Sequence, residues 1–391
     1  MEEVYIIQGA RTAFAEISQS FKDVTATDLG VIAAKGAMKR ADIQPDQIDH
    51  VVFGNVQHST KDAHFLSRHI GLKAGLPIET PAIGINRLCG TGLEVLITGA
   101  LYIKAGEANV VLAGGTENMS QVPHVIRGMR DGIKLGSPVI EDWLWDGLYD
   151  TYGQISMAET AENVAKKYEI MREEIDEHAF LSHERAKKAR QAGYLEEEIV
   201  PVTIQTRKGD QVIVEDEHIR DTSLEQLGKL KARFVKGGVV TPGNASGMVD
   251  GAAAAILASE TFVKEHHLKP IARLVSSAVT GVEPKYMGVG PVPAIQQALA
   301  KANLTMDDMD LVEINEAFSA QYLACQKLLG FSPEKGNVNG GAIAIGHPLA
   351  ASGTRITLSL INELRRRGKR YGVSAVCIGG GQGIAAIWEV L

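Results

Sequence analysis

Two cysteines and one histidine stand in short glycine-rich segments near opposite ends of the chain. Cys89 lies in NRLCGTG, His347 in NGGAIAIGHP and Cys377 in CIGGGQG. Together they provide a thiol at a turn before a helix, a histidine in a glycine-walled turn and a second thiol at the end of a strand. A thiol nucleophile with a base beside it is suited to acyl transfer between thioesters.

Cys89 precedes a stretch from Leu93 to about Ala105 that is apolar nearly all round, which predicts a buried helix. The N–H groups and the dipole at its N-terminus favour a thiolate. Glycines at positions 90 and 92 let a substrate approach the backbone closely. The alternative is that Cys89 is a small buried hydrophobic residue.

The surroundings of the other two groups also leave two interpretations open. Gly346 and Pro348 hold His347 in one place, but a structural turn histidine has the same pattern. Cys377 ends an apolar strand before three glycines, so it either faces a ligand or belongs to the core. The glycines do not have the GxGxxG spacing of a dinucleotide site opening a helix, so we do not expect NAD.

An amide and a carboxylate, Asn315 and Glu316, follow the predicted strand Leu311–Ile314. Open α/β folds place their sites at the carboxyl ends of strands. Hydrogen-bonded structural side chains are the alternative here. The third cysteine, Cys325, falls in an apolar helical stretch and is predicted to be inert core.

The elements that position these residues form two similar halves. Residues 37–55 align with residues 298–316 without a gap, with five identities in 19 positions. After each copy come a turn that carries the candidate residue, an apolar helix and a buried strand that ends in glycines. Alternating strands and helices predict a largely parallel sheet covered on both faces. The equivalent turns of two such halves would meet.

A long insertion interrupts the first half. Residues 119–248 are rich in charged helices, such as the one predicted over Arg172–Ala192. A hairpin is predicted from Val202–Thr206 to Val212–Glu215, turning at Lys208-Gly209-Asp210. The insertion is too large for a plain loop and is typical of a lid or ligand-binding subdomain.

Composition limits the class of protein. The 391 residues carry a net charge of −7, which disfavours nucleic acid as a partner. No apolar run approaches the ~20 residues of a membrane span, so no membrane partner is expected. No secretory signal is visible, and three distant cysteines favour a reducing compartment, so we expect a cytoplasmic protein. No CxxC pair or HExxH helix suggests a metal.

Nine segments in order resemble the thiolase family, the acetyl-CoA acetyltransferases and 3-ketoacyl-CoA thiolases. They are VYIIQGARTAF, NRLCGTG, GGTENMS, TAENVA, GNASG, YMGVGPVPA, NEAF, NVNGGAIAIGHP and CIGGGQG. The resemblance implies two duplicated βαβαβαββ-type halves in a layered αβαβα arrangement with an inserted loop domain. The domains would be residues 1–118 with 249–268, the insertion 119–248 and residues 269–391. A homodimer or homotetramer is expected.

The resemblance implies an acyl-CoA C-acyltransferase that condenses two acyl-CoA molecules, or cleaves 3-ketoacyl-CoA, through an acyl-cysteine. Cys89 would be the nucleophile, His347 its base and Cys377 the acid/base for the second substrate. Asn315 would hold a water that forms one oxyanion hole with His347, and N–H groups of Cys89 and Gly379 would form the other. No cofactor is implied, because coenzyme A is part of the substrate.

The insertion would bind coenzyme A in that family. Arg220 would approach its nucleotide and Ser246 its pantetheine. The tunnel would be lined by Met157, Phe234, Met248, Met287 and Phe318. The chain departs from the family pattern at Ser156, where short-chain members usually have histidine, and at Ala350, where they have glycine. Both departures bear on the preferred acyl chain.

Two other functions share parts of this pattern. A catalytically silent thiolase-like partner would bind acyl-CoA without the complete set of Cys89, Asn315, His347 and Cys377. A decarboxylating condensing enzyme usually pairs its cysteine with two histidines, whereas here a second cysteine and NEAF occupy the site. Acetylation of Cys89 by acetyl-CoA would separate an enzyme from a silent partner.

Overall fold

The computed structural model describes residues 2–207 and 209–391. One continuous path of strands crosses the molecule in the order β14-β15-β16-β13-β1-β12-β5-β3-β4. The two halves of this path join where β1 pairs antiparallel with β13, through Tyr5 opposite Arg273 and Ile6 opposite Ala272. The first half holds β1 (Val4–Arg11), β3 (His50–Gly54), β4 (Ala82–Ile85), β5 (Val110–Glu117) and β12 (Val249–Ser259). The second holds β13 (Ala272–Gly281), β14 (Leu311–Ile314), β15 (Tyr371–Ile378) and β16 (Gln382–Val390).

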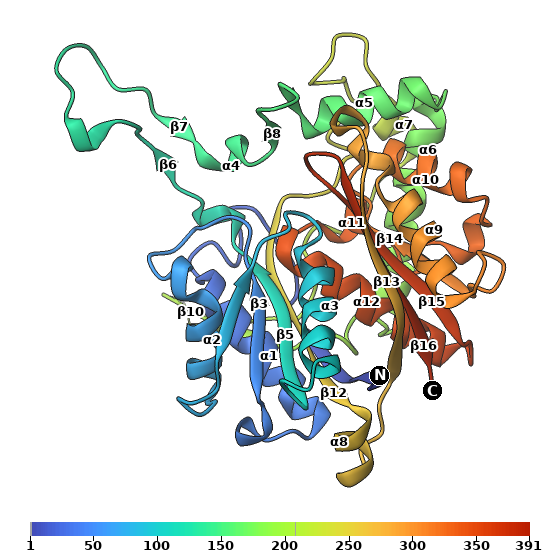
Figure 1. The fold of residues 1–391 in the computed structure, drawn as a ribbon. Helices are drawn as coiled ribbons and strands as arrows, with labels where there is room; N and C mark the ends of the chain where they lie inside the picture. Colours follow the sequence, from blue (N-terminus) through green and yellow to red (C-terminus); the bar gives the residue numbers. More distant parts are fainter. Residues whose placement is uncertain (1, 208) are drawn as a thin grey trace.

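Helices cover the two half-sheets in layers. Helices α1 (Ala26–Ala41) and α2 (Leu66–Ala74) pack on the outer face of the first half. Helices α9 (Pro291–Ala302) and α10 (Ser319–Leu329) pack on the outer face of the second. A further core surrounds α3 (Thr91–Lys104) and α12 (Leu349–Arg366), which lie between the half-sheets (Figure 1). This is the layered αβαβα arrangement that the resemblance implies. The prediction of a largely parallel sheet is wrong: β14–β15, β3–β4 and β3–β5 pair in parallel, whereas β1–β12, β1–β13, β5–β12, β13–β16 and β15–β16 pair antiparallel.

The two halves repeat one another in detail. Helices α1 and α9 end at Asp42 and Asn303, which both adopt the left-handed conformation, with φ of 53° and 55°. The two caps are separated by the same 261 positions as the aligned segments. Each is followed by a buried strand, β3 or β14, that pairs in parallel with the next strand of its half.

The two central helices touch at their N-termini. A Cβ on Gly353 would lie 2.2 Å from the backbone nitrogen of Leu93, and a Cβ on Gly92 would lie 2.5 Å from the oxygen of Ala350. The hydroxyl of Thr354 donates to the oxygen of Gly92 at 2.6 Å. Only glycine allows this approach, which brings the turn before α3 and the turn before α12 together.

The insertion forms helices, a hairpin and an arm. Helix α6 spans Arg172–Gln191, as predicted, beside α5 (Met157–Lys167) and α7 (Leu224–Gly228). The hairpin pairs β10 (Val202–Thr206) with β11 (Gly209–Ile213). Gly209 and Asp210 therefore lie in a strand rather than in the predicted turn, and Lys208 lies outside the described residues. The arm holds β6 (His124–Val125), β7 (Glu141–Asp142), α4 (Trp143–Asp146), β8 (Tyr149–Asp150) and β9 (Ile155–Ser156) and extends from the body (Figure 1).

The remaining elements are short. In the described residues they are β2 (Ala15–Glu16), α8 (Glu260–Glu265), α11 (Ala342–Ile345) and six short 3₁₀ segments at Pro45–Gln47, Ala63–Phe65, Met119–Gln121, Met129–Asp131, Pro284–Val289 and Pro333–Lys335. Among the described residues, no helix is long and apolar enough to cross a membrane.

Candidate active site

Local hydrogen bonds fix the turn that carries Cys89. Leu88 adopts a positive φ of 48°, and its N–H donates to the side chain of Asn86 at 2.9 Å. The N–H of Arg87 donates to the hydroxyl of Thr91, the first residue of α3, at 2.8 Å. The turn is thereby held against the helix N-terminus, with Cys89 directly before it.

Two backbone N–H groups point at the Cys89 sulfur. Burial raises the pKa of the thiol to about 11, whereas hydrogen bonds from the N–H of Gly379 and of Cys89 itself lower it. The thiolate expected from the helix N-terminus is therefore not the resting form, because burial outweighs these donors. These are the two donors predicted for an oxyanion hole. Because they already face the sulfur, they also stabilise negative charge that develops beside it.

His347 is a neutral imidazole with one nitrogen fixed. Its Nδ1 lies 2.6 Å from the hydroxyl of Ser352, and that hydroxyl donates to the oxygen of Pro348 at 3.3 Å. The hydroxyl therefore accepts from Nδ1–H, and this network assigns the lone pair to Nε2. Burial, and then the charge of Arg355, lower the pKa of His347 to about 3.

The side chain of Asn315 contacts the free nitrogen of His347. Asn315 Nδ2 lies 3.3 Å from Nε2 of the ring. The backbone N–H of His347 donates to the oxygen of Gly247 at 2.9 Å, so the turn is anchored to the chain that enters β12. The predicted strand-end amide therefore faces the histidine.

Cys377 is the second-last residue of β15 (Tyr371–Ile378) and is fully buried. Burial, and then the proximity of Cys89, raise the pKa of its thiol well above the ordinary value. It shares a small apolar cluster with Met287 and Ala317, against which Met157 and Phe318 pack. The two cysteines that lie 288 positions apart in sequence are therefore neighbours.

The carboxylate of Glu316 turns away from this centre and anchors the insertion. It accepts from the hydroxyl of Ser182 at 2.7 Å, from Asn337 at 2.9 Å and from the N–H of Ile343 at 3.2 Å. Burial alone would raise its pKa, but hydrogen bonds led by that of His178 lower it to about 2. For Glu316, the structural alternative is the one that the structure supports.

An apolar cavity of about 420 Å³ opens onto His347. Six of the seven residues predicted to bind coenzyme A line it: Arg220, Ser246, Met157, Phe234, Met248 and Phe318. Met287 does not line it and instead packs beside Cys377. Other lining residues include Ile17, Met119, Trp145, Leu148, Ser156 and Leu349.

Sequence reasoning missed the partners of Arg220. Its guanidinium donates to Glu16 at 2.8 Å, and Nδ1 of His218 lies 2.8 Å from the same carboxylate oxygen. Glu16 and His218 line the cavity as well. The run of polar residues around Arg220 was the available signal, but its partner Glu16 is 204 positions away.

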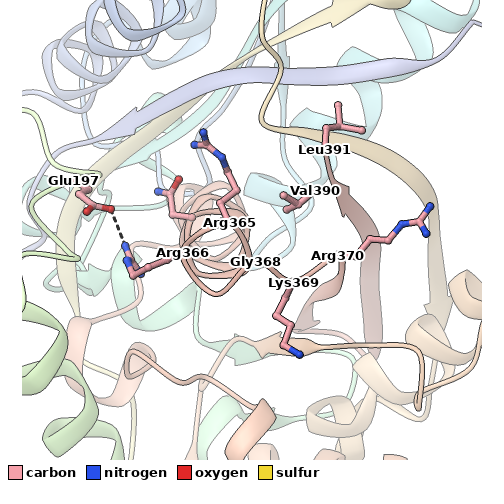
Figure 2. Close-up of a pocket in the computed structure, with 9 residues that line it drawn as sticks. Glu197, Arg365, Arg366, Gly368, Lys369, Arg370, Val390 and Leu391 are labelled. Atoms are coloured by element: carbon pink, nitrogen blue, oxygen red, sulfur yellow. Dashed lines mark hydrogen bonds and ion pairs between the residues drawn. The ribbon is translucent and has the colours of Figure 1, made fainter.

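A second cavity, of about 670 Å³, lies at the other end of α12. Figure 2 shows that the cations around it point in different directions, with Arg366 paired to Glu197. Arg370 pairs with Glu389. This second cavity is lined by none of the predicted site residues. Over the part of the chain that the structure describes, no cluster of three or more histidine, cysteine or acidic side chains could hold a metal.

Comparison with known proteins agrees with this geometry. The thiolase N-terminal domain matches residues 4–261 and the thiolase C-terminal domain matches residues 268–390. A mitochondrial 3-ketoacyl-CoA thiolase of Bos taurus is 53% identical over 99% of this chain and 98% of its own length. An acetyl-CoA acetyltransferase of Cupriavidus necator is 46% identical over the full length of both chains.

A solved structure shows the same fold. The human mitochondrial 3-ketoacyl-CoA thiolase in complex with CoA superimposes with a TM-score of 0.97 at 51% identity, covering 100% of this chain and 98% of that one. The relatives of Bos taurus and Homo sapiens, 53% and 52% identical, are both named as mitochondrial 3-ketoacyl-CoA thiolases. The cytoplasmic location expected from the sequence is therefore wrong.

Proposed function

This chain belongs to the thiolase family and is an acyl-CoA C-acyltransferase, and on that premise we propose that Cys89 carries the acyl group between two substrates. The observation that carries the proposal is the pair of N–H groups, from Gly379 and Cys89, on the Cys89 sulfur. His347, which lines the apolar cavity and carries its lone pair on Nε2 facing Asn315, supplies the base.

In the first half-reaction, His347 Nε2 takes the thiol proton of Cys89. The sulfur attacks the thioester carbon, the bond from that carbon to coenzyme A breaks, and the leaving thiolate takes the proton of Cys377. Cys377 is then a thiolate, and His347 keeps the proton of Cys89 on Nε2. The N–H groups of Gly379 and Cys89 stabilise the charge on the carbonyl oxygen. Burial keeps His347 neutral, so the lone pair of Nε2 is available at neutral pH.

In the second half-reaction, Cys377 removes a proton from the α-carbon of the second acyl-CoA. The resulting enolate attacks the acyl-Cys89 carbon, a carbon–carbon bond forms and the bond to Cys89 breaks. The Cys89 sulfur then takes its proton back from His347 Nε2, which restores both groups. His347 and a water held by Asn315 stabilise the enolate oxygen. The contact of 3.3 Å between Asn315 and His347 supports this pairing. Thiolysis runs the same steps in reverse.

The apolar cavity takes the coenzyme A ester. Arg220 lies at its exposed end, where a phosphate can reach the guanidinium, and Ser246, Met248 and Phe234 lie along it. Met157 and Phe318 lie nearest the cysteines, where Met287 packs behind them. In the division of labour that we propose, residues 119–248 bind the coenzyme, and residues 1–118 with 249–268 and residues 269–391 form the two catalytic halves.

A homo-oligomer is part of the proposal. Strand β4 ends the sheet and leaves an edge that another chain can pair with. The arm exposes large apolar side chains, among them Leu135, Val139 and Tyr152. Exposed apolar groups of this kind are typical of protein–protein contacts. Light scattering after size exclusion separates monomer, dimer and tetramer.

Mass spectrometry tests the central step. After incubation with acetyl-CoA, the intact protein should gain one acetyl group, and peptide mapping should place it on Cys89. Cys89→Ala should gain none. An acetyl group on another residue, or none on the wild-type protein, would contradict the proposed carrier. Rates of thiolysis for 3-ketoacyl-CoA esters of four to sixteen carbons would then define the acyl chain.

A further inference from the structure

Glu117 is a buried carboxylate surrounded by hydrogen-bond donors. It ends β5 and is fully buried. Its Oε1 accepts from the N–H of Gln57 at 2.8 Å and from Asn55 Nδ2 at 2.9 Å. Its Oε2 accepts from the N–H of Val56 at 3.2 Å and of Ala350 at 3.1 Å. Four donors thus face two oxygens.

One of these donors belongs to the helix that follows the catalytic histidine. Ala350 is the second residue of α12, where backbone N–H groups have no partner within the helix. The residue before the helix is Pro348, which has no side-chain acceptor to cap it. Glu117 supplies that cap from 233 positions away. His347 lies three residues before the capped N–H.

The contact also joins the two halves next to the nucleophile. A Cβ on Gly115 would lie 1.8 Å from the oxygen of Ala350, so the start of α12 is pressed onto β5. When it is ionised, Glu117 raises the pKa of the Cys89 thiol, although burial of the thiol is the larger cause. Burial raises the pKa of Glu117 itself to about 8, whereas the N–H groups of Gln57, Ala350 and Val56 lower it. The carboxylate therefore contacts the start of α12, directly after the His347 turn.

We propose that Glu117 is a positioning residue of the acyl transfer reaction: it holds the start of α12 against β5 and the loop after β3, and so sets His347 in line with Cys89. This inference rests on the proposed roles of Cys89 and His347. This positioning role requires that both carboxylate oxygens of Glu117 accept hydrogen bonds. The isosteric Glu117→Gln places an NH₂ group against two N–H donors and loses two of the four hydrogen bonds.

The test compares Glu117→Gln with Asp49→Asn. Asp49 Oδ2 also accepts from two backbone N–H groups, of Asn109 at 2.7 Å and Val110 at 2.9 Å, but it lies outside the cavity and the two catalytic turns. The measurements are the rate of Cys89 acetylation by rapid-quench mass spectrometry, kcat and KM for acetoacetyl-CoA thiolysis, and the thermal unfolding midpoint.

Glu117→Gln should lower kcat and the acetylation rate at least tenfold, with KM within twofold of the wild type. Asp49→Asn should lower the unfolding midpoint and leave kcat within twofold. A kcat of Glu117→Gln within twofold, or a rise in KM alone, overturns the inference. If the wild-type protein does not acetylate Cys89, the proposed function fails instead.

Glu117→Asp covers the case in which the amide variant does not fold. It keeps the charge but is one methylene shorter, so it cannot reach the loop after β3 and Ala350 together. We expect at least a fivefold loss of kcat at unchanged KM. A wild-type kcat for this variant equally overturns the inference.

Discussion

Replacing Ser352 by alanine tests whether the protonation state of His347 is set by one hydroxyl. The hydroxyl accepts from Nδ1–H of the ring at 2.6 Å, and both residues are buried. Removing it leaves Nδ1–H without a partner. The proton then moves to Nε2, where the ring can no longer accept the proton of Cys89. We therefore expect a loss of acylation rather than a loss of substrate binding.

The size of the loss follows from the cost of the unpaired donor. A buried donor left without an acceptor costs about 1–3 kcal/mol. If that cost falls on the competent tautomer alone, its population, and with it the rate, drops roughly 5-fold to 150-fold. KM should change little, because Ser352 does not line the cavity.

The assay is the single-turnover rate of Cys89 acetylation, measured with the thermal unfolding midpoint. Ser374→Ala is the matched control, because the hydroxyl of Ser374 also accepts from a buried ring N–H, that of Trp388, at 2.9 Å. Both variants should lose stability, and only Ser352→Ala should lose rate. An acetylation rate within twofold of the parent would refute the reasoning about the tautomer.

Four further outcomes are expected. Cys89→Ser should retain less than about a tenth of the activity while folding, because a hydroxyl ionises far less than a thiol near neutral pH; a higher activity would contradict the carrier role. Cys377→Ala should still become acetylated on Cys89 but should not condense two acetyl-CoA molecules, and normal condensation would make Cys377 a core residue. Ser156→His should favour four-carbon over six-carbon 3-ketoacyl-CoA esters by kcat/KM. Ser156→Ala is its control, because it loses the same N-cap hydrogen bond of α5, worth about 1 kcal/mol, and should not change this preference. An equal ratio of kcat/KM in both variants would exclude a role of residue 156 in the pocket. Folding lowers the pKa of His347 from 6.5 to about 3, so the unfolded state binds more protons and stability is lost as pH drops from about 6.5 towards 3. His347→Asn should therefore lose less stability than the wild type between pH 7 and pH 4 in urea unfolding. Equal losses would contradict the assignment of a neutral ring.

The residues of the proposed catalytic centre were found because their signals are local in the sequence. The apolar helix after Cys89 indicates a buried N-terminus by itself, and Gly346 and Pro348 frame His347 within three residues. The duplication then predicts that the two turns meet, since equivalent turns of two packed halves face each other. The structure confirms that the two turns meet, because Gly92 and Gly353 are in contact.

Partners from distant segments could not be predicted in the same way. Glu117 reaches Ala350 across 233 positions, and Arg220 reaches Glu16 across 204. Which side chains meet depends on the register of strands and the approach of helices, neither of which is visible in a single sequence. The second role of Ser156 was missed for another reason: its side chain was considered only as part of the pocket, yet it also caps α5 through Glu159.

The error about location has a chemical origin. Three unpaired cysteines indicate a reducing compartment, and more than one compartment of a cell is reducing. Composition therefore indicates that the protein works under reducing conditions, in which Cys89 stays a thiol, but it does not identify the compartment. The chemistry of the site needs only the first of these. Burial raises the pKa of Cys89 and keeps His347 neutral, and the same burial excludes bulk water from an enolate. The packing of the two halves around these turns provides this burial in whichever reducing compartment the protein occupies.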